Sequence, residues 1–238
     1  MDQTFVRAMV DLRDRTLQKS RIAFGNRIAA VENGKDTMDD LTRKMIEKWS
    51  DQFAILEKDC EKDLKAYLKD ERIIQRMCKV KGLSYILAGK LSSMIDIRRA
   101  DTISALWRYA GMSVVDGHAE KLVKGEKAHF NRRLKSTCYL VASSFLKCKS
   151  PYRQIYDSAR QKYEDYVHTV ACPICKKETG EPWRDGHKHA AALRKMIKIF
   201  LAHLWMVWRE QEGLPIREPY VQEQLGHTHI SSPEEFGW

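Results

Sequence analysis

The sequence predicts an all-α protein, for three reasons. Proline and glycine are few, 6 and 12 among 238 residues. Apolar residues recur three or four positions apart over most of the chain, which is the spacing of helices that bury one face. The chain is 43% apolar, and at this length it can bury a core without disulfides. We expect an antiparallel coiled-coil arm followed by a helical domain with a helix-hairpin-helix-like segment and a small zinc-knuckle-like insert.

The arm is expected over residues 1–78. Residues 4–32 have helical periodicity and stop at Asn33-Gly34, a helix C-terminal signal. A second periodic run starts at Thr37 or Asp39 and meets no glycine or proline before Gly82. Thirty helical residues span about 45 Å, so this helix needs a partner along its length, and the first helix is the nearest one. We expect homo-oligomerisation through this arm; a plain scaffold is the alternative.

The helical domain is expected over residues 79–212. Two short helices should flank a polar turn at 96–101, and the first of them starts at Gly82. In helix-hairpin-helix modules a glycine at such a start lets the backbone approach a phosphate. Lys81 and Gly82 are therefore candidate nucleic-acid contacts, although an ordinary helical hairpin explains the same pattern.

Three further helices are expected in this domain. They begin near Asn131, at Pro151 and at Ala190, and the last is apolar enough to lie at the centre of the core. An insert at 169–189, punctuated by Pro and Gly, precedes the last helix. Residues 213–238 are predicted to be a polar, loosely docked tail.

The charge distribution points to a polyanionic partner. Lys and Arg outnumber Asp and Glu by 42 to 32, giving a net charge of +10. Residues 120–162 hold eleven basic residues against three acidic ones. A basic stretch of this kind is typical of a surface that contacts phosphates. The alternative is a solvated helix face.

The insert carries the most specific chemical pattern in the chain. Cys172 and Cys175 have the C-x₂-C spacing with which two thiolates of one turn reach the same zinc, and His187 and His189 follow. Both histidines can be ligands only if the next helix starts after them, because residues two apart on a helix point to opposite sides. Otherwise His168 can supply a ligand. Four protein ligands predict a structural zinc; a metal-free loop with reduced cysteines is the alternative.

Composition also bears on location. No apolar run reaches the roughly 20 residues of a membrane span, and the N-terminal residues do not have the pattern of a secretory signal. The other cysteines are dispersed, which argues against a disulfide framework. We therefore expect a cytoplasmic, nucleoid-associated protein without membrane contact.

The order of several motifs resembles the C-terminal part of the bridge-RNA-guided transposases of the insertion sequence 110, 116 and 902 group. The likeness covers most of residues 1–210. Its motifs are an Arg-rich N-terminal helix, a coiled coil, a hairpin segment, an Asn-Arg-Arg-Leu-Lys run and a closing helix, found here at 6–15, 38–70, 82–112, 131–135 and 192–196. The resemblance implies DNA binding, transposition and recombination, and makes structured RNA as credible a ligand as DNA.

Two departures from that family concern catalysis. The four acidic residues of its RuvC-like nuclease domain have no counterpart in this sequence. Its serine nucleophile, usually in Gln-Ser-Gly, has no counterpart in residues 114–120. The nearest hydroxyl is that of Ser113, just before this stretch, which makes Ser113 a weak catalytic candidate. The hairpin's second glycine is replaced by Ser84. We therefore expect no strand cleavage by the chain itself.

The sequence predicts a nucleic-acid-binding protein resembling a transposase C-terminal region. The candidate contacts are Lys81, Gly82, Asn131, Arg132, Arg133, Lys135, Arg194 and Lys195. Two alternatives stay open. One is a recombinase subunit that works with a separate nuclease, and the other is a zinc-stabilised adaptor or assembly protein.

Overall fold

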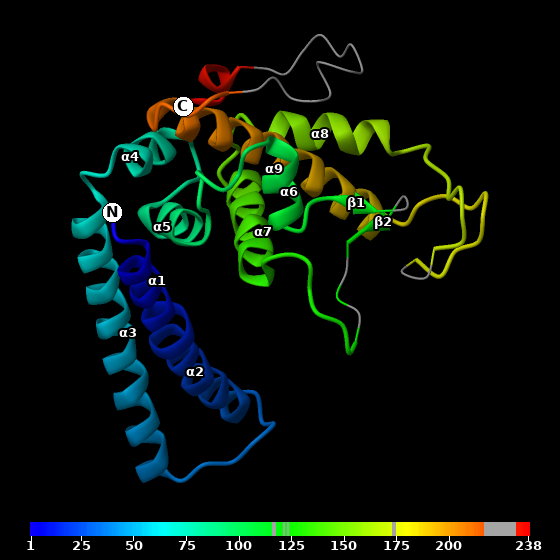
Figure 1. Cartoon of the computed structure of the whole chain (residues 1–238). Helices are drawn as coiled ribbons and strands as arrows, with labels where there is room; N and C mark the ends of the chain where they lie inside the picture. Colours follow the sequence, from blue (N-terminus) through cyan, green and yellow to red (C-terminus); the bar gives the residue numbers. More distant parts are fainter. Residues whose placement is uncertain (116–117, 121, 123, 173–174, 217–231) are drawn as a thin grey trace.

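The computed structural model describes residues 1–115, 118–120, 122, 124–172, 175–216 and 232–238, and this part of the chain is mostly helical. The predicted all-α class is confirmed. The strands named in it are β1 (Val114–Val115) and β2 (His118–Ala119), which pair antiparallel. Figure 1 shows an arm of antiparallel helices projecting from a helical body. None of the described helices combines the length and apolarity that crossing a membrane requires.

The arm consists of two antiparallel helical segments. The first runs through α1 (Gln3–Asp11), a π-helical stretch (Leu12–Gln18) and α2 (Lys19–Glu32). The second is α3 (Asp40–Leu68), which lies beside α2 (Figure 1). Side chains of Asp2 and Asp39 accept hydrogen bonds from free N–H groups at the two helix starts. Supercoiling of the pair stays a prediction.

The long helix matches the thirty residues of helical periodicity, but it ends before the bound at residue 78 that was expected for the arm. α3 stops at Leu68, and α4 (Arg72–Lys79) is a separate helix whose apolar side chains belong to the main core. No glycine or proline marks this break. The segment after Leu68 therefore belongs to the body rather than to the arm.

The base of the arm is buried in the body through α5 (Tyr85–Met94). α5 contacts α1 and α3, and most of its residues are buried. A Cβ atom on Gly89 would lie 2.8 Å from the Cδ1 atom of Leu68. Glycine at this position therefore lets α5 cross the base of α3 closely.

α9 (Asp185–Gln211) lies at the centre of the body, as the sequence predicts. It contacts α6 (Ile103–Tyr109), α7 (Arg132–Lys147) and α8 (Arg153–Lys162). Trp205 is fully buried, and its indole N–H donates a hydrogen bond to the Ala100 carbonyl at 2.6 Å. The apolar side of α9 thus joins the surrounding helices into one core.

The C-terminal end is docked more firmly than the sequence predicts. Residues Pro233–Phe236 form a 3₁₀ helix, and Phe236 is buried. The Trp238 indole N–H donates to the Tyr152 hydroxyl at 2.7 Å, and that hydroxyl lies 2.6 Å from Nδ1 of His203. The aromatic residues at the end of the chain bind back onto the core, so the description as a loosely docked tail is wrong for residues 232–238.

Candidate functional site

Four metal-ligating side chains converge in the loop before α9. Ligand atoms of His168, Cys172, Cys175 and His187 all lie within 4.8 Å of one another. The three residues from the loop are buried, and His187 is half-buried in the first turn of α9. A His₂Cys₂ group of this size can hold a metal ion.

Backbone hydrogen bonds hold this loop in the shape of a short hairpin. The Cys172 N–H donates to the Lys177 carbonyl at 2.8 Å, and the His168 N–H donates to the Glu181 carbonyl at 2.9 Å. The Trp183 N–H donates to the Tyr166 carbonyl, also at 2.9 Å. We call residues 163–187 the metal knob. Its hairpin brings His168 next to the two cysteines.

The chemistry of the donors fits a metal. The Nε2 atom of His168 is buried and has no hydrogen-bond partner in the described part of the chain, which is costly unless something binds it. The Sγ atom of Cys175 lies 3.0 Å from Nδ1 of His187. Burial, together with a hydrogen bond to Cys172, raises the pKa of the Cys175 thiol. A cation would reverse that shift, because metals bind the thiolate.

His189, the fourth ligand in the zinc prediction, lies outside this group. Its Nδ1 atom is 2.7 Å from the hydroxyl of Tyr156 on α8. α9 begins at Asp185, so His187 and His189 both lie on the helix and point to different sides. His168, the alternative that the sequence left open, takes the place of His189.

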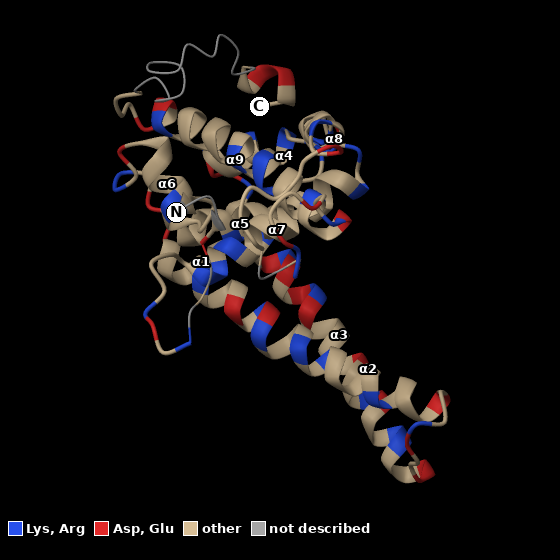
Figure 2. Cartoon of the chain, turned by 90° about the vertical axis from the view of Figure 1, so that its right-hand side faces the viewer, with Lys and Arg blue, Asp and Glu red and all other residues tan. Residues whose placement is uncertain are grey.

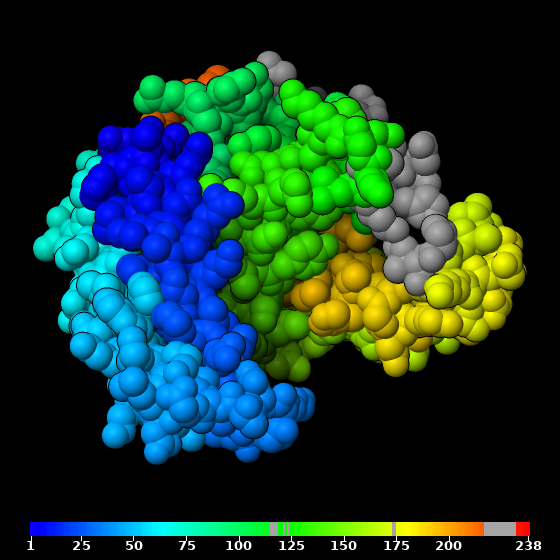
Figure 3. All heavy atoms as spheres, turned by 90° about the horizontal axis from the view of Figure 1, so that it is seen from below, coloured from blue at the N-terminus to red at the C-terminus, as the bar shows by residue number. Residues whose placement is uncertain are grey.

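A basic groove lies between the base of the arm and α7. Its cavity volume is about 530 Å³, and a smaller hollow of about 340 Å³ extends it along the arm through Lys19. Four cationic side chains and one carboxylate line the larger cavity: Arg15, Lys90, Arg132, Arg133 and Asp14. Figure 3 shows the blue arm and the green body side by side on this face. We call this feature the arm groove.

The cations of the arm groove differ in how far they are neutralised. Lys90 is buried and its Nζ atom lies 2.6 Å from a carboxylate oxygen of Asp14. Arg133 pairs with Asp11. No hydrogen bond or ion pair is found for the guanidinium groups of Arg15 and Arg132 among the described residues. These two arginines are available to an external anion.

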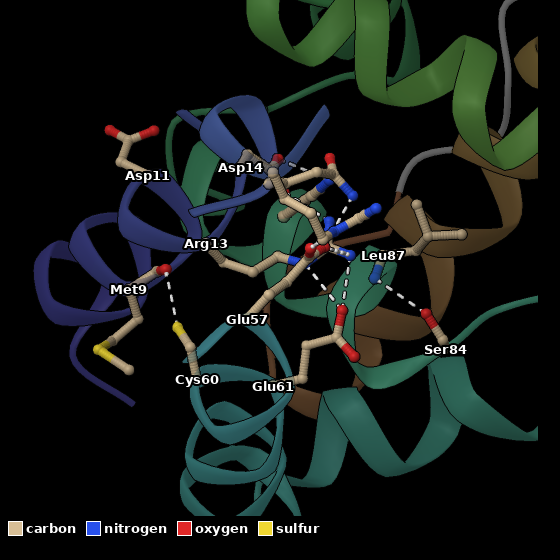
Figure 4. A network of polar contacts seen from close by, with 12 residues as sticks. Met9, Asp11, Arg13, Asp14, Glu57, Cys60, Glu61, Ser84 and Leu87 are labelled. Atoms are coloured by element: carbon tan, nitrogen blue, oxygen red, sulfur yellow. Dashed lines mark hydrogen bonds and ion pairs between the residues drawn. The ribbon is translucent and has the colours of Figure 1, made fainter. Parts of the chain in front are cut away.

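An ion-pair network fixes the arm wall of the groove (Figure 4). Glu57 of α3 is only 5% exposed, and its carboxylate lies 2.8 Å from Arg13 and 2.7 Å from Arg21. Arg13 also binds Glu61 at 2.6 Å. Arg13 therefore faces α3, while Asp14 and Arg15 line the groove. Elsewhere on the arm Lys and Arg alternate with Asp and Glu (Figure 2).

The residues that the sequence singled out for nucleic-acid contact lie in three places. Arg132 and Arg133 line the arm groove, and Asn131 caps α7 by accepting from the N–H groups of Arg133 and Leu134. Lys135 lies on another side of α7. Its Nζ atom donates to the Glu120 carbonyl at 2.7 Å.

The second group surrounds Arg194 on α9. Burial and the positive charge of Arg194 lower the pKa of both Lys135 and Lys198. Lys195, the next residue on α9, is exposed. The predicted cations thus do not form one continuous face.

Lys81 and Gly82 lie near the opposite end of α7. The Gly82 carbonyl accepts a 2.6 Å hydrogen bond from Ser144, about 18 Å along the helix from Arg132. Gly82 has φ +102°, and a Cβ there would lie 3.0 Å from Phe145. This glycine serves close packing against α7, and its location separates it from the arm groove.

Ser113, the weak catalytic candidate, lies just before β1. Its hydroxyl lies 3.0 Å from a carboxylate oxygen of Glu120 and donates to it. Sequence reasoning did not single out Glu120, nor did it single out Arg15 and Lys90 in the groove. The last two share no sequence motif with Arg132 and meet it only through folding.

Comparison with known proteins gives no matching family model, no matching curated protein and no matching solved structure.

Proposed function

We propose that the protein binds nucleic acid by placing a sugar-phosphate backbone in the arm groove. The observation that carries this proposal is the convergence of Arg15 and Arg132, two guanidinium groups without a partner among the described residues, on one cavity. Guanidinium groups bind phosphate oxygens in a bidentate manner. Contacts of this kind position a duplex but do not read its sequence.

The groove also offers neutral donors for phosphate oxygens. Ser93, Ser136 and Thr137 line it beside the cations. Lys90 and Arg133 each form an ion pair with a carboxylate, Asp14 and Asp11 respectively. We therefore assign the strongest phosphate contacts to Arg15 and Arg132. The net charge of +10 supports attraction of a polyanion at a distance.

On the resemblance to the transposase C-terminal region, we propose that this binding serves DNA transposition or recombination. In our proposal the chain supplies binding and no strand cleavage. Ser113 is held by one carboxylate, and a metal ion bound in the metal knob would have four protein side chains as ligands. A closed shell leaves no position for a reactive water.

We assign zinc to the metal knob. Two thiolates and two imidazoles are the ligand set that Zn²⁺ prefers for tetrahedral structural sites. In this assignment the ion joins the hairpin at His168 and Cys172 to the first turn of α9 at His187. Its function is to hold the knob in place beside the body.

A second candidate function, homo-oligomerisation or adaptor binding through the arm, is favoured by exposed apolar side chains. Leu41, Met45 and Trp49 follow one another at four-residue intervals on α3 and are 70%, 55% and 50% exposed. Exposed apolar stripes of this kind are typical of helix–helix interfaces. We propose that a second arm covers them. Sedimentation of Met45→Glu against wild type tests this, since monomerisation is expected.

Fluorescence anisotropy with a labelled blunt duplex tests the arm groove. The double variant Arg15→Gln, Arg132→Gln should bind at least about tenfold more weakly, and the slope of log affinity against log salt should fall by about 1.8. Lys62→Gln on the exposed side of α3 is the matched control for loss of charge. Equal losses in both variants, or binding that does not depend on salt, would contradict the proposal.

A further inference from the structure

Three aromatic rings lie together on the metal knob. The ring centroids of Tyr163 and Tyr166 are 5.1 Å apart, and those of Trp183 lie 5.5 Å from Tyr163 and 5.3 Å from Tyr166. All three side chains are half-buried. Their hydroxyl and indole N–H groups form no hydrogen bond among the described residues. The cluster therefore keeps both ring surface and polar edges open to a ligand.

The metal ligands hold this cluster in position. The Trp183 ring stacks on the imidazole of His187, with centroids 4.2 Å apart and an interplanar angle of 19°. The backbone N–H of Trp183 donates a hydrogen bond to the Tyr166 carbonyl. A metal bound to His187 would fix the imidazole, and with it the orientation of the Trp183 ring. Rings held rigidly in this way lose little entropy when they bind a flat ligand.

The surroundings of the rings favour an anionic ligand. Burial raises the pKa of the Tyr163 hydroxyl, and the positive charges of Lys162 and Arg194 partly oppose this shift. Arg194 has no ion-pair partner among the described residues. Nearby carboxylates are partly neutralised, since Glu164 pairs with Lys188 at 3.1 Å and Asp185 with Arg160 at 3.3 Å. Glu181 pairs with Lys177 at 2.6 Å, and Asp165 and Glu178 are the carboxylates of residues 163–187 that form no ion pair among the described residues. Stacking rings beside a free arginine suit nucleotides that have lost their base-pairing partner.

We propose that Tyr163, Tyr166 and Trp183 form a stacking site for unpaired nucleobases, with Arg194 contacting the backbone of the same strand. This inference rests on the nucleic-acid binding proposed above and extends it from duplex to single-stranded or looped segments. In Figure 3 the yellow knob and the blue arm lie on either side of the green body on one face. A duplex in the arm groove can therefore send a single-stranded end toward the knob.

The test compares three labelled probes by anisotropy: a blunt duplex, the same duplex with a six-nucleotide overhang, and that overhang built from abasic nucleotides. Wild-type protein should bind the overhang probe about tenfold more tightly than the blunt one. The abasic overhang, which keeps the phosphates, should lose most of that gain. Trp183→Leu and Tyr163→Leu should each reduce the gain severalfold while leaving affinity for the blunt duplex unchanged.

Tyr67→Leu on α3, at an aromatic side chain 42% exposed and outside both proposed sites, is the matched control, and its ratio of overhang to blunt affinity should equal that of wild type. Metal content of Trp183→Leu and Tyr163→Leu must stay at one equivalent, so that a lost gain reflects the ring and not a collapsed knob. If Trp183→Leu loses its metal, the stacking site is judged from Tyr163→Leu.

The possible failures are distinguishable. Duplex binding without any gain from the overhang, or an equal gain from the abasic overhang, overturns the stacking site and leaves the arm groove intact. Failure to bind the blunt duplex overturns the groove instead. A proline-rich peptide can also dock on aromatic rings, so binding of such a peptide that depends on Trp183 and displaces the overhang would equally count against nucleobases as the ligand.

Discussion

The metal knob takes its donor groups from one short stretch, His168 to His187, whereas the arm groove takes its cations from α5, α7 and the π-helical stretch. The knob is held by a hairpin and, in our assignment, by an ion. The groove exists only because the arm base, α5 and α7 pack together. A site built from one short stretch can fold or unfold independently of the rest of the molecule. A site built between packed helices depends on the stability of the whole fold.

The largest expected effect is on the knob. Removing the metal with a chelator should unfold it locally, because binding energies of about 10–16 kcal/mol are typical of structural zinc. Hydrogen exchange of the Cys172, His168 and Trp183 amides should accelerate by orders of magnitude. Amides of α9 beyond Phe200 should stay protected. Accelerated exchange throughout α9 would show that the knob is not independent of the core.

Single ligand variants sharpen the same prediction. Cys175→Ser and His168→Ala should lower metal content from one equivalent, as measured by plasma mass spectrometry. His189→Ala is the matched control, since His189 contacts Tyr156 instead, and it should keep the metal. Loss of the metal in His189→Ala, with the metal kept in His168→Ala, would restore the ligand set first predicted from the sequence.

The next largest expected effect is a loss of unfolding free energy when the ion-pair network beside the arm groove is broken. Glu57→Ala removes the carboxylate between Arg13 and Arg21 and should destabilise the protein by about 2 kcal/mol, less than a fully buried pair, because Arg13 keeps Glu61. Urea unfolding measures this loss. Nucleic-acid affinity should fall as well, while metal content should not change. An unchanged unfolding midpoint would mean that the network does not support the arm.

How far the sequence predicts each region follows from the same contrast. The C-x₂-C spacing predicted two ligands because both lie in one turn. The choice between His168 and His189 depended on where the last helix begins, and the helix expected from Ala190 begins at Asp185 instead. Helix boundaries are the least certain part of such predictions.

The sequence predicted only two of the four cationic residues that line the arm groove. Arg132 and Arg133 stood out within a basic run, but Lys90 lies in an otherwise apolar helix and Arg15 in a helix of mixed charge. Nothing local shows that these residues meet. The bound expected for the arm, residue 78, lies beyond the break after Leu68 for a related reason. Packing of α4 into the core ends the long helix there, without a glycine or proline to announce it.

A smaller effect separates packing from phosphate contact at Gly82. Gly82→Ala places a Cβ at positive φ and 3.0 Å from Phe145, which should cost about 1–2 kcal/mol of unfolding free energy. Affinity for duplex DNA should be unchanged under conditions where the variant is folded. A loss of affinity without a loss of stability would return Gly82 to the nucleic-acid interface.

The smallest effect tests whether the second basic group belongs to the same interface as the groove. Lys195→Gln removes an exposed charge on α9. If a blunt duplex lies only in the arm groove, the slope of log affinity against log salt should stay within error of wild type, whereas Arg132→Gln should reduce it by about 0.9. A matching reduction in Lys195→Gln would join the two cationic groups into one footprint. The arm groove and the basic residues around Arg194 would then belong to one nucleic-acid-binding surface that runs across α7.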